Sequence, residues 1–168
     1  MENNNYSWKT RLFSKTWNIY RNNRQVGFIK KSFWSQKSIA EINGRQYLFQ
    51  ESGFFNRKTN IIDIAENKII GTIKYGSWGN KATVEMNGEI SNWRYTNTWN
   101  TKWAIHDSKG LSILYKGSSF SENGQIETNG DVDVKLLMGL YIYSYFLRML
   151  LAVLIILFTP TILRFLLH

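Results

Sequence analysis

The sequence predicts a mainly β protein, an antiparallel sandwich or barrel, followed by one apolar helix. Short stretches that alternate apolar and polar residues fill the chain from residue 17 to residue 127, and polar turn residues separate them. Aromatic residues make up 15% of the chain, which suits the faces of a β-sheet better than a helical bundle. The segment from Leu136 to His168 contains two basic side chains and no acidic one. A chain of 168 residues is long enough for one domain with a real core.

About twelve strands are expected from the turn residues alone. They cover residues 8–13, 17–21, 25–30, 37–42, 45–51, 58–65, 68–75, 81–86, 89–95, 101–106 and 111–116, with a last short strand after Gly124. The strongest turn signals are Asn43-Gly44 and Asn87-Gly88, because a type I′ hairpin turn requires positive φ at both central residues. The hairpins resemble one another loosely, without the fixed period of a solenoid or a propeller.

The helix is expected to begin near residue 131, after the turn residues Asn129 and Gly130. Asp131 and Asp133 are placed to cap it, because a carboxylate in the first turn accepts hydrogen bonds from free backbone N–H groups and favours the positive end of the helix dipole. A metal site is the alternative interpretation of these two carboxylates, but no further ligand cluster is close in the sequence. We therefore expect a helix cap here.

The apolar tail divides into two halves near Arg148. The first half contains Gly139, Ser144 and three tyrosines, whose hydroxyl groups need partners when buried, and its length suits the interior of a barrel. The second half, from Met149 to Phe158, contains no polar side-chain atom other than a thioether. A buried core explains the first half well, whereas the second half would expose a long aliphatic surface.

Three segments are therefore expected within one domain. Residues 1–130 form the strands, residues 131–150 a central hydrophobic helix, and residues 151–168 an apolar extension that contacts a membrane. The alternative is a single membrane span from Leu136 to Phe158 with Arg148 inside it, since the surrounding apolar residues could outweigh the cost of one arginine.

The charge of the chain points to an anionic partner. The formal net charge is +9, and the part before residue 135 carries 18 basic and 12 acidic residues. Such a balance favours lipid headgroups or nucleic acid, or it serves solubility alone. The sequence contains no arginine-rich run or nucleic-acid motif, so we expect membrane lipids as partners and no nucleic acid. The candidate lipid contacts are the adjacent basic pairs and the arginines of the tail: Lys30, Lys31, Arg57, Lys58, Arg148 and Arg164.

The sequence shows no catalytic constellation. His106 adjoins Asp107, but neighbouring residues of a strand point to opposite faces and are poorly placed as a dyad. The chain contains no cysteine, no Gly-x-Ser-x-Gly elbow and no phosphate-binding loop. We expect a protein that is not an enzyme and that uses neither a cofactor nor a metal. Trp99 and Trp103 would share a face of an extended segment, either in the core or as a lipid or peptide contact.

A dozen short strands followed by Gly130-Asp131-Val132-Asp133-Val134-Lys135 and an apolar helix resemble the tubby-like superfamily, which includes tubby C-terminal domains, phospholipid scramblases and LURP-one-related proteins. The similarity covers approximately residues 7–150 in pattern. Its most specific part runs from Trp103 through Asp107 and Gly110 to the start of the helix. The resemblance implies a closed antiparallel barrel of about twelve strands around a hydrophobic C-terminal helix. The acidic calcium-binding segment of the scramblases has no match beyond Asp131 and Asp133.

We therefore expect a non-enzymatic, membrane-associated tubby-like module that binds anionic lipid headgroups through a basic barrel surface. The barrel is expected on the cytoplasmic side, since the first residues lack the apolar core of a signal peptide and the polar region is basic. One alternative is scramblase-like activity. Another is a soluble cytoplasmic scaffold or ligand-binding barrel whose helix is fully buried.

Overall fold

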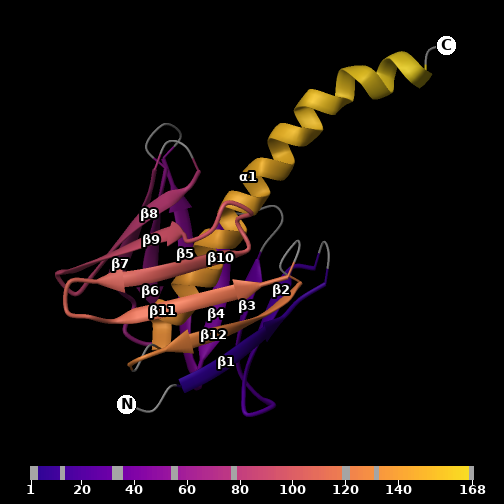
Figure 1. The fold of residues 1–168 in the computed structure, drawn as a ribbon. Helices are drawn as coiled ribbons and strands as arrows, with labels where there is room; N and C mark the ends of the chain where they lie inside the picture. The colour runs from indigo at the N-terminus through magenta and orange to yellow at the C-terminus, as the bar shows by residue number, and fades with distance from the viewer. Residues whose placement is uncertain are drawn as a thin grey trace.

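A computed structural model describes residues 4–11, 14–31, 36–53, 57–76, 79–118, 122–130 and 133–166, with side chains of the helix described as far as Thr159. It contains twelve strands and one helix (Figure 1). The strands are β1 (Asn4–Lys9), β2 (Thr16–Arg21), β3 (Arg24–Lys31), β4 (Lys37–Ile42), β5 (Arg45–Ser52), β6 (Lys58–Asp63), β7 (Lys68–Tyr75), β8 (Lys81–Met86), β9 (Glu89–Tyr95), β10 (Lys102–Asp107), β11 (Ser112–Gly117) and β12 (Asn123–Thr128). The helix is α1 (Asp133–Leu166).

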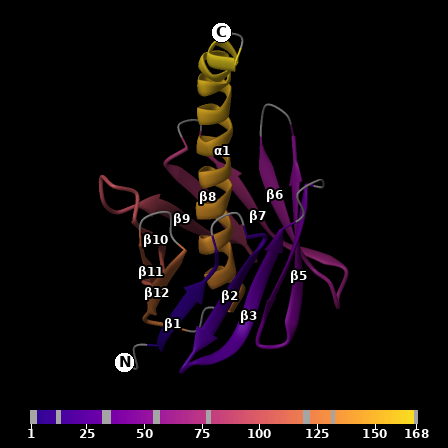
Figure 2. The same cartoon turned by 90° about the vertical axis from the view of Figure 1, so that its right-hand side faces the viewer.

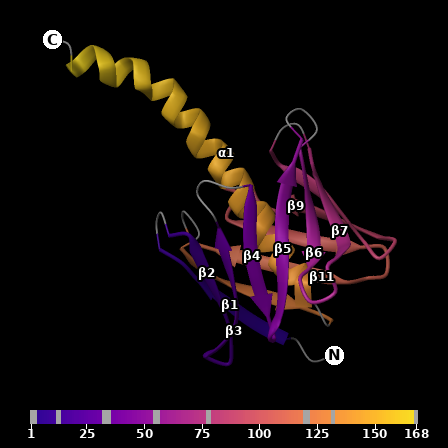
Figure 3. The same ribbon diagram turned by 180° about the vertical axis from the view of Figure 1, so that it is seen from behind.

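The strands form one closed antiparallel barrel. Each strand pairs with its neighbours in sequence, and β1 closes the barrel by pairing with β12. Closure leaves no free sheet edge. Figures 2 and 3 show the two walls of the barrel around the first half of α1. The expected fold class, a twelve-stranded antiparallel barrel around a C-terminal helix, is confirmed.

The turn residues account for most of the strand boundaries. Asn43 and Gly44 have φ angles of 50° and 80°, and Asn87 and Gly88 have 51° and 77°, as a type I′ turn requires. The first strand differs from expectation, since it covers Asn4–Lys9 and not residues 8–13. In this register β1 points both Tyr6 and Trp8 into the core. Burial of these two aromatic side chains therefore sets the position of the strand.

The barrel repeats a four-stranded unit three times, which the sequence shows only as loose similarity between hairpins. The units are β2–β5, β6–β9, and β10–β12 completed by β1. The last strand of each unit places a fully buried aromatic residue opposite a fully buried isoleucine of the next unit. These pairs are Phe49 with Ile61, Trp93 with Ile105, and Trp8 with Ile19. The same register therefore recurs at each junction between units.

The first half of α1 fills the barrel. Every residue from Val134 to Phe146 is buried, and Leu147 is half-buried. Tyrosines of this half stack on aromatic residues of the barrel wall. The ring centroids of Tyr143 and Trp103 are 4.0 Å apart, and those of Tyr141 and Phe49 are 4.5 Å apart. A helix enclosed on every side needs an apolar surface all round, which explains the composition of this half.

The helix α1 begins inside one end of the barrel and emerges from the other end. We call the half of the barrel from which α1 emerges the exit half; it contains the ends of the odd-numbered strands and the starts of the even-numbered ones. The opposite half, where α1 begins, is the far half. Beyond the exit half, α1 projects away from the strands and bends (Figure 1). Its exposed segment is therefore attached to one end of the barrel only.

Candidate membrane-contacting site

The projecting part of α1 presents an apolar surface. From Met149 to Phe158 the large apolar side chains are exposed, except for the half-buried Leu151, and exposure rises from 37% at Met149 to 70% at Ile156. The stretch Asp133–Thr159, 27 residues, is long and apolar enough to cross a bilayer. The core helix of a soluble protein can have the same length and composition. The change from buried to exposed apolar residues within one helix distinguishes the two halves, and it occurs at Leu147 and Arg148.

Arg148 is held at the mouth of the barrel by Glu51. Arg148 Nη2 donates to Glu51 Oε1 at 2.5 Å, and the Tyr141 hydroxyl donates to the same oxygen at 2.7 Å. The guanidinium also lies over the Tyr145 ring, 5.7 Å from its centroid. These contacts tie the last buried turns of α1 to the end of β5. They place the Arg148 guanidinium at the rim of the barrel and outside the exposed apolar segment.

The structure places the basic pairs of the sequence analysis in the exit half. Lys30 and Lys31 end β3, whereas Arg57 precedes β6 and Lys58 begins it. Arg57 and Lys58 line a cavity of about 250 Å³ together with Glu51 and Tyr145. Burial and the nearby Arg148 hold the pKa of Lys31 well below its usual value, against the opposing effect of Glu51.

Of these basic residues, Arg148 pairs with the carboxylate of Glu51, and Lys31 lies near enough for that carboxylate to affect its pKa. Arg57 and Lys58 line the same cavity as Glu51, whereas Lys30 is exposed. Arg164 belongs to α1, but its side chain lies outside the described residues. A direct contact of these six residues with lipid stays a prediction.

The charges of the whole barrel are separated between its two halves, which the sequence analysis missed. The basic residues described in the exit half are Lys9, Arg11, Lys15, Lys30, Lys31, Lys37, Arg57, Lys58, Lys74, Lys81, Arg94, Lys102, Lys116 and Arg148. The acidic residues described there are Glu51 and Glu122. The exit half is therefore positive, although Lys74 and Lys116 form ion pairs with Glu85 and Glu127 of the far half.

The far half has the opposite balance. Its described acidic residues are Glu41, Asp63, Glu66, Glu85, Glu89, Asp107, Glu127 and Asp133, and its basic residues are Arg21, Arg24, Arg45, Lys68, Lys109 and Lys135. These charges are scattered along the sequence. They separate in space because antiparallel strands bring alternate strand ends together, a signal that can be found by sorting charges by strand direction.

A groove on the outer face of β7–β10 also lies towards the exit half. It has a volume of about 770 Å³, and its lining includes Lys81, Arg94 and His106. His106 is exposed, whereas the side chain of Asp107 is buried on the other face of the strand, so the two do not form a dyad. Trp99 and Trp103 do not share a face either. Trp99 is 85% exposed in the β9–β10 connection because the chain turns there, and Trp103 is fully buried in β10.

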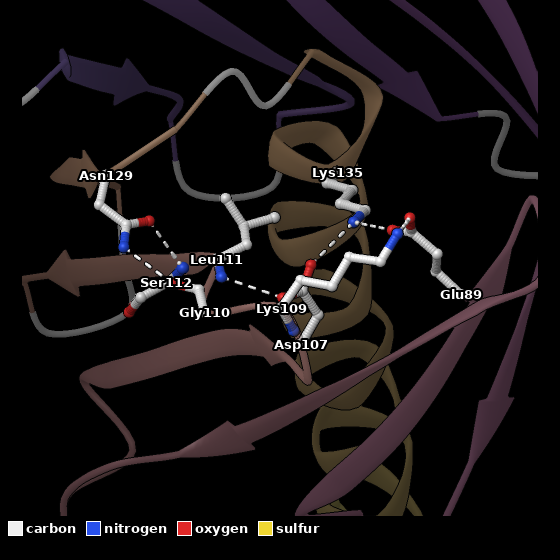
Figure 4. A network of polar contacts seen from close by, with 8 residues as sticks. All are labelled: Glu89, Asp107, Lys109, Gly110, Leu111, Ser112, Asn129 and Lys135. Carbon is white, nitrogen blue, oxygen red and sulfur yellow. Dashed lines mark hydrogen bonds and ion pairs between the residues drawn. The ribbon is translucent and has the colours of Figure 1, made fainter.

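A polar network fixes the start of α1 to the far half (Figure 4). Lys135 Nζ lies 3.2 Å from Asp107 Oδ2 and 3.3 Å from Glu89 Oε2. Lys109 also pairs with Glu89. Burial by itself would raise the pKa of Asp107, but hydrogen bonds from the Leu111 N–H and from Lys135 hold that pKa below its usual value. The network joins β9, β10 and α1, so it has a structural role.

Asp133 lies in the first turn of α1, where its Oδ1 accepts a hydrogen bond from Asn43 Nδ2 at 2.9 Å. It therefore links the helix to the β4–β5 turn, and its role as a cap stays a prediction. Asp131 lies outside the described residues. Within the described part of the chain, no group of three or more His, Cys, Asp or Glu side chains could hold a metal ion.

Comparison with known proteins found no protein-family model, no curated protein and no solved structure that matches this chain. The resemblance to the tubby-like superfamily therefore stays a prediction based on the sequence pattern.

Proposed function

We propose that this protein is a non-enzymatic, membrane-associated barrel of the tubby-like type, in which one helix serves as both core and membrane anchor. The observation that carries the proposal is the change along α1 from enclosed residues up to Phe146 to exposed apolar residues from Met149. An exposed apolar surface of this kind is a site for a membrane or a protein partner. A bilayer is favoured because the surface surrounds a projecting helix and continues along it.

The dimensions of the exposed segment suit a bilayer. From Met149 to Leu166 the helix spans about 27 Å at 1.5 Å per residue, close to the roughly 30 Å of a hydrocarbon core. Each Leu, Ile, Val or Phe at the centre of a bilayer contributes about −0.3 to −0.6 kcal/mol to insertion. The eight such residues between Leu150 and Phe158 therefore contribute roughly −2 to −5 kcal/mol. Arg148 subtracts little from this, because Glu51 holds it at the barrel mouth.

The position of α1 also argues against a membrane span that begins at Leu136. Residues up to Phe146 are covered by the barrel wall, so lipid cannot reach them unless the barrel opens. Opening would expose the polar backbone of the strands to hydrocarbon, where each unsatisfied group costs several kcal/mol. The proposed membrane-contacting segment therefore begins after Arg148, at Met149.

The basic exit half supports a preference for anionic lipids. Lysine and arginine near an anionic surface contribute about 1 kcal/mol each, and the cytoplasmic leaflet carries the negative charge. The proposed location of the barrel is accordingly the cytoplasmic side. The proposed function requires lysine and arginine side chains of the exit half to bind lipid headgroups, and it involves no chemical reaction.

The test is fractionation of full-length protein that carries a double substitution in the projecting helix. Ile155→Lys with Ile156→Lys places two charges in the proposed span, each at a cost of about 2.5–3.5 kcal/mol. We expect the wild type in the membrane fraction and the variant in the supernatant. The control is Ile90→Lys, an exposed isoleucine on the barrel wall, which should leave membrane association unchanged. Wild-type protein that stays in the supernatant without detergent would refute the anchor.

A further inference from the structure

We infer that the barrel stands end-on on an anionic bilayer surface, with its exit half against the lipid headgroups and its far half in the aqueous phase. The inference rests on the proposed function, because α1 must first bring the barrel to a membrane. It goes further by naming the docking face and the lipid charge that this face recognises. Two separate observations support end-on docking: the direction in which α1 leaves the barrel, and the distribution of charge between the two halves of the barrel.

The helix direction selects the end of the barrel. Because α1 leaves through the exit half, a bilayer that receives Met149 to Phe158 lies next to the rim where Lys102 and Lys81 begin their strands (Figures 1 and 2). Both lysines are exposed, and within the described residues neither side chain has a hydrogen-bond or ion-pair partner. They are therefore free to pair with phosphate or carboxylate groups of lipids.

The charge separation favours the same end. A six-residue strand spans about 20 Å, so charges at the far ends of the strands lie well beyond the Debye length of about 8 Å at physiological ionic strength. Glu85 and Glu127 lie closer to the exit half, because they pair with Lys74 and Lys116. An anionic surface at the exit half thus attracts the basic residues there and is screened from Glu89 and Asp107, whereas Glu85 offsets the charge of Lys74. With the barrel inverted, those carboxylates would face the headgroups.

Trp99 adds a third observation. It lies in the β9–β10 connection of the exit half and is largely exposed. Tryptophan is enriched at the level of lipid headgroups, where its ring is partly apolar and its N–H is wetted.

The absence of cysteine permits a direct test of orientation. Thr98→Cys and Ser108→Cys each give full-length protein one labelling site, and the two sites flank β10 in the exit half and the far half. Each labelled protein is reconstituted into nanodiscs of phosphatidylcholine, with or without phosphatidylserine, that contain a headgroup nitroxide. We expect strong quenching of a fluorophore at position 98 and weak quenching at position 108, with a larger difference when phosphatidylserine is present.

Two pairs of charge substitutions test the cause. Lys81→Gln with Lys102→Gln removes two cations from the exit half, and Arg24→Gln with Lys68→Gln removes two from the far half for the same change in net charge. Since each cation near the surface is worth about fivefold, the first pair should lower the ratio of docked to undocked barrels by roughly 30-fold. The second pair should change that ratio little, because of screening.

Equal quenching at the two labels, or equal effects of the two pairs, would overturn end-on docking while the protein remained in the nanodisc fraction. Retention on a heparin column provides a further measurement. If the Lys81→Gln, Lys102→Gln variant is no longer retained while its lipid quenching is unchanged, end-on docking is overturned in favour of a nucleic acid or an acidic protein as the partner. Failure of the wild type to enter nanodiscs would instead refute the proposed anchor.

Discussion

Gly139 tests how tightly the barrel encloses α1, because two principles predict opposite effects for Gly139→Ala. In an exposed helix this substitution stabilises by about 1 kcal/mol. In this barrel, a Cβ at position 139 would lie only 2.2 Å from the Tyr115 hydroxyl oxygen and 2.3 Å from its ring carbon Cζ. Tyr115 is fully buried and donates to the Leu136 carbonyl at 3.0 Å. The new methyl group therefore requires Tyr115 or the helix to move.

We expect Gly139→Ala to be destabilising. Overpacking of a core costs about 1–3 kcal/mol, and displacement of the Tyr115 hydroxyl costs a further 1–3 kcal/mol. Less the gain in helix propensity, the free energy of unfolding should fall by about 1–5 kcal/mol, which lowers the midpoint of thermal unfolding by on the order of 10 °C.

The assay is thermal unfolding of full-length protein in detergent, followed by tryptophan fluorescence. Adding Tyr115→Leu to Gly139→Ala should cost less than the two single substitutions together, because the smaller side chain makes room for the methyl group. An unfolding midpoint that rises in Gly139→Ala would show that α1 is not enclosed in this register.

Two further predictions concern the network at the start of α1. Lys135→Met should lower the free energy of unfolding by about 1–3 kcal/mol, because it leaves the Asp107 carboxylate, of which only 5% is exposed, without its cation. Lys109→Met, at an exposed side chain, should have little effect on the free energy of unfolding. Equal losses of stability in the two variants, measured by chemical denaturation, would contradict this prediction. Since the folded-state pKa values of Asp107 and Glu89 lie below their usual values, their contribution is present above about pH 4 and disappears as the pH falls through the folded pKa values. Thermal unfolding from pH 6 to pH 3 should show this loss in the wild type and a weaker one in Asp107→Asn, whereas parallel curves would contradict it.

Local sequence predicted the strands where turns and alternation agree. Asn43-Gly44 and Asn87-Gly88 specify their hairpins, because positive φ at both positions restricts the turn to one type. The first strand was misplaced, because no comparable turn marks its limits and its register depends on burial of Tyr6 and Trp8. The expectation that Trp99 and Trp103 share a face required an extended segment between them. The chain turns there instead, because Asn97 accepts hydrogen bonds from the Thr101 and Lys102 N–H groups and Asn100 has a φ of 55°.

The sequence by itself determined the barrel-type alternation, the turns and the apolar tail, because each depends on the chemistry of neighbouring residues. The closed tertiary structure decided which part of the tail is enclosed and which is exposed, since coverage by the wall depends on the length of the strands around it. It also decided the charge separation. Lys30, Lys81 and Lys102 lie far apart in the chain, and they gather in one half of the barrel only because antiparallel strands bring alternate ends together.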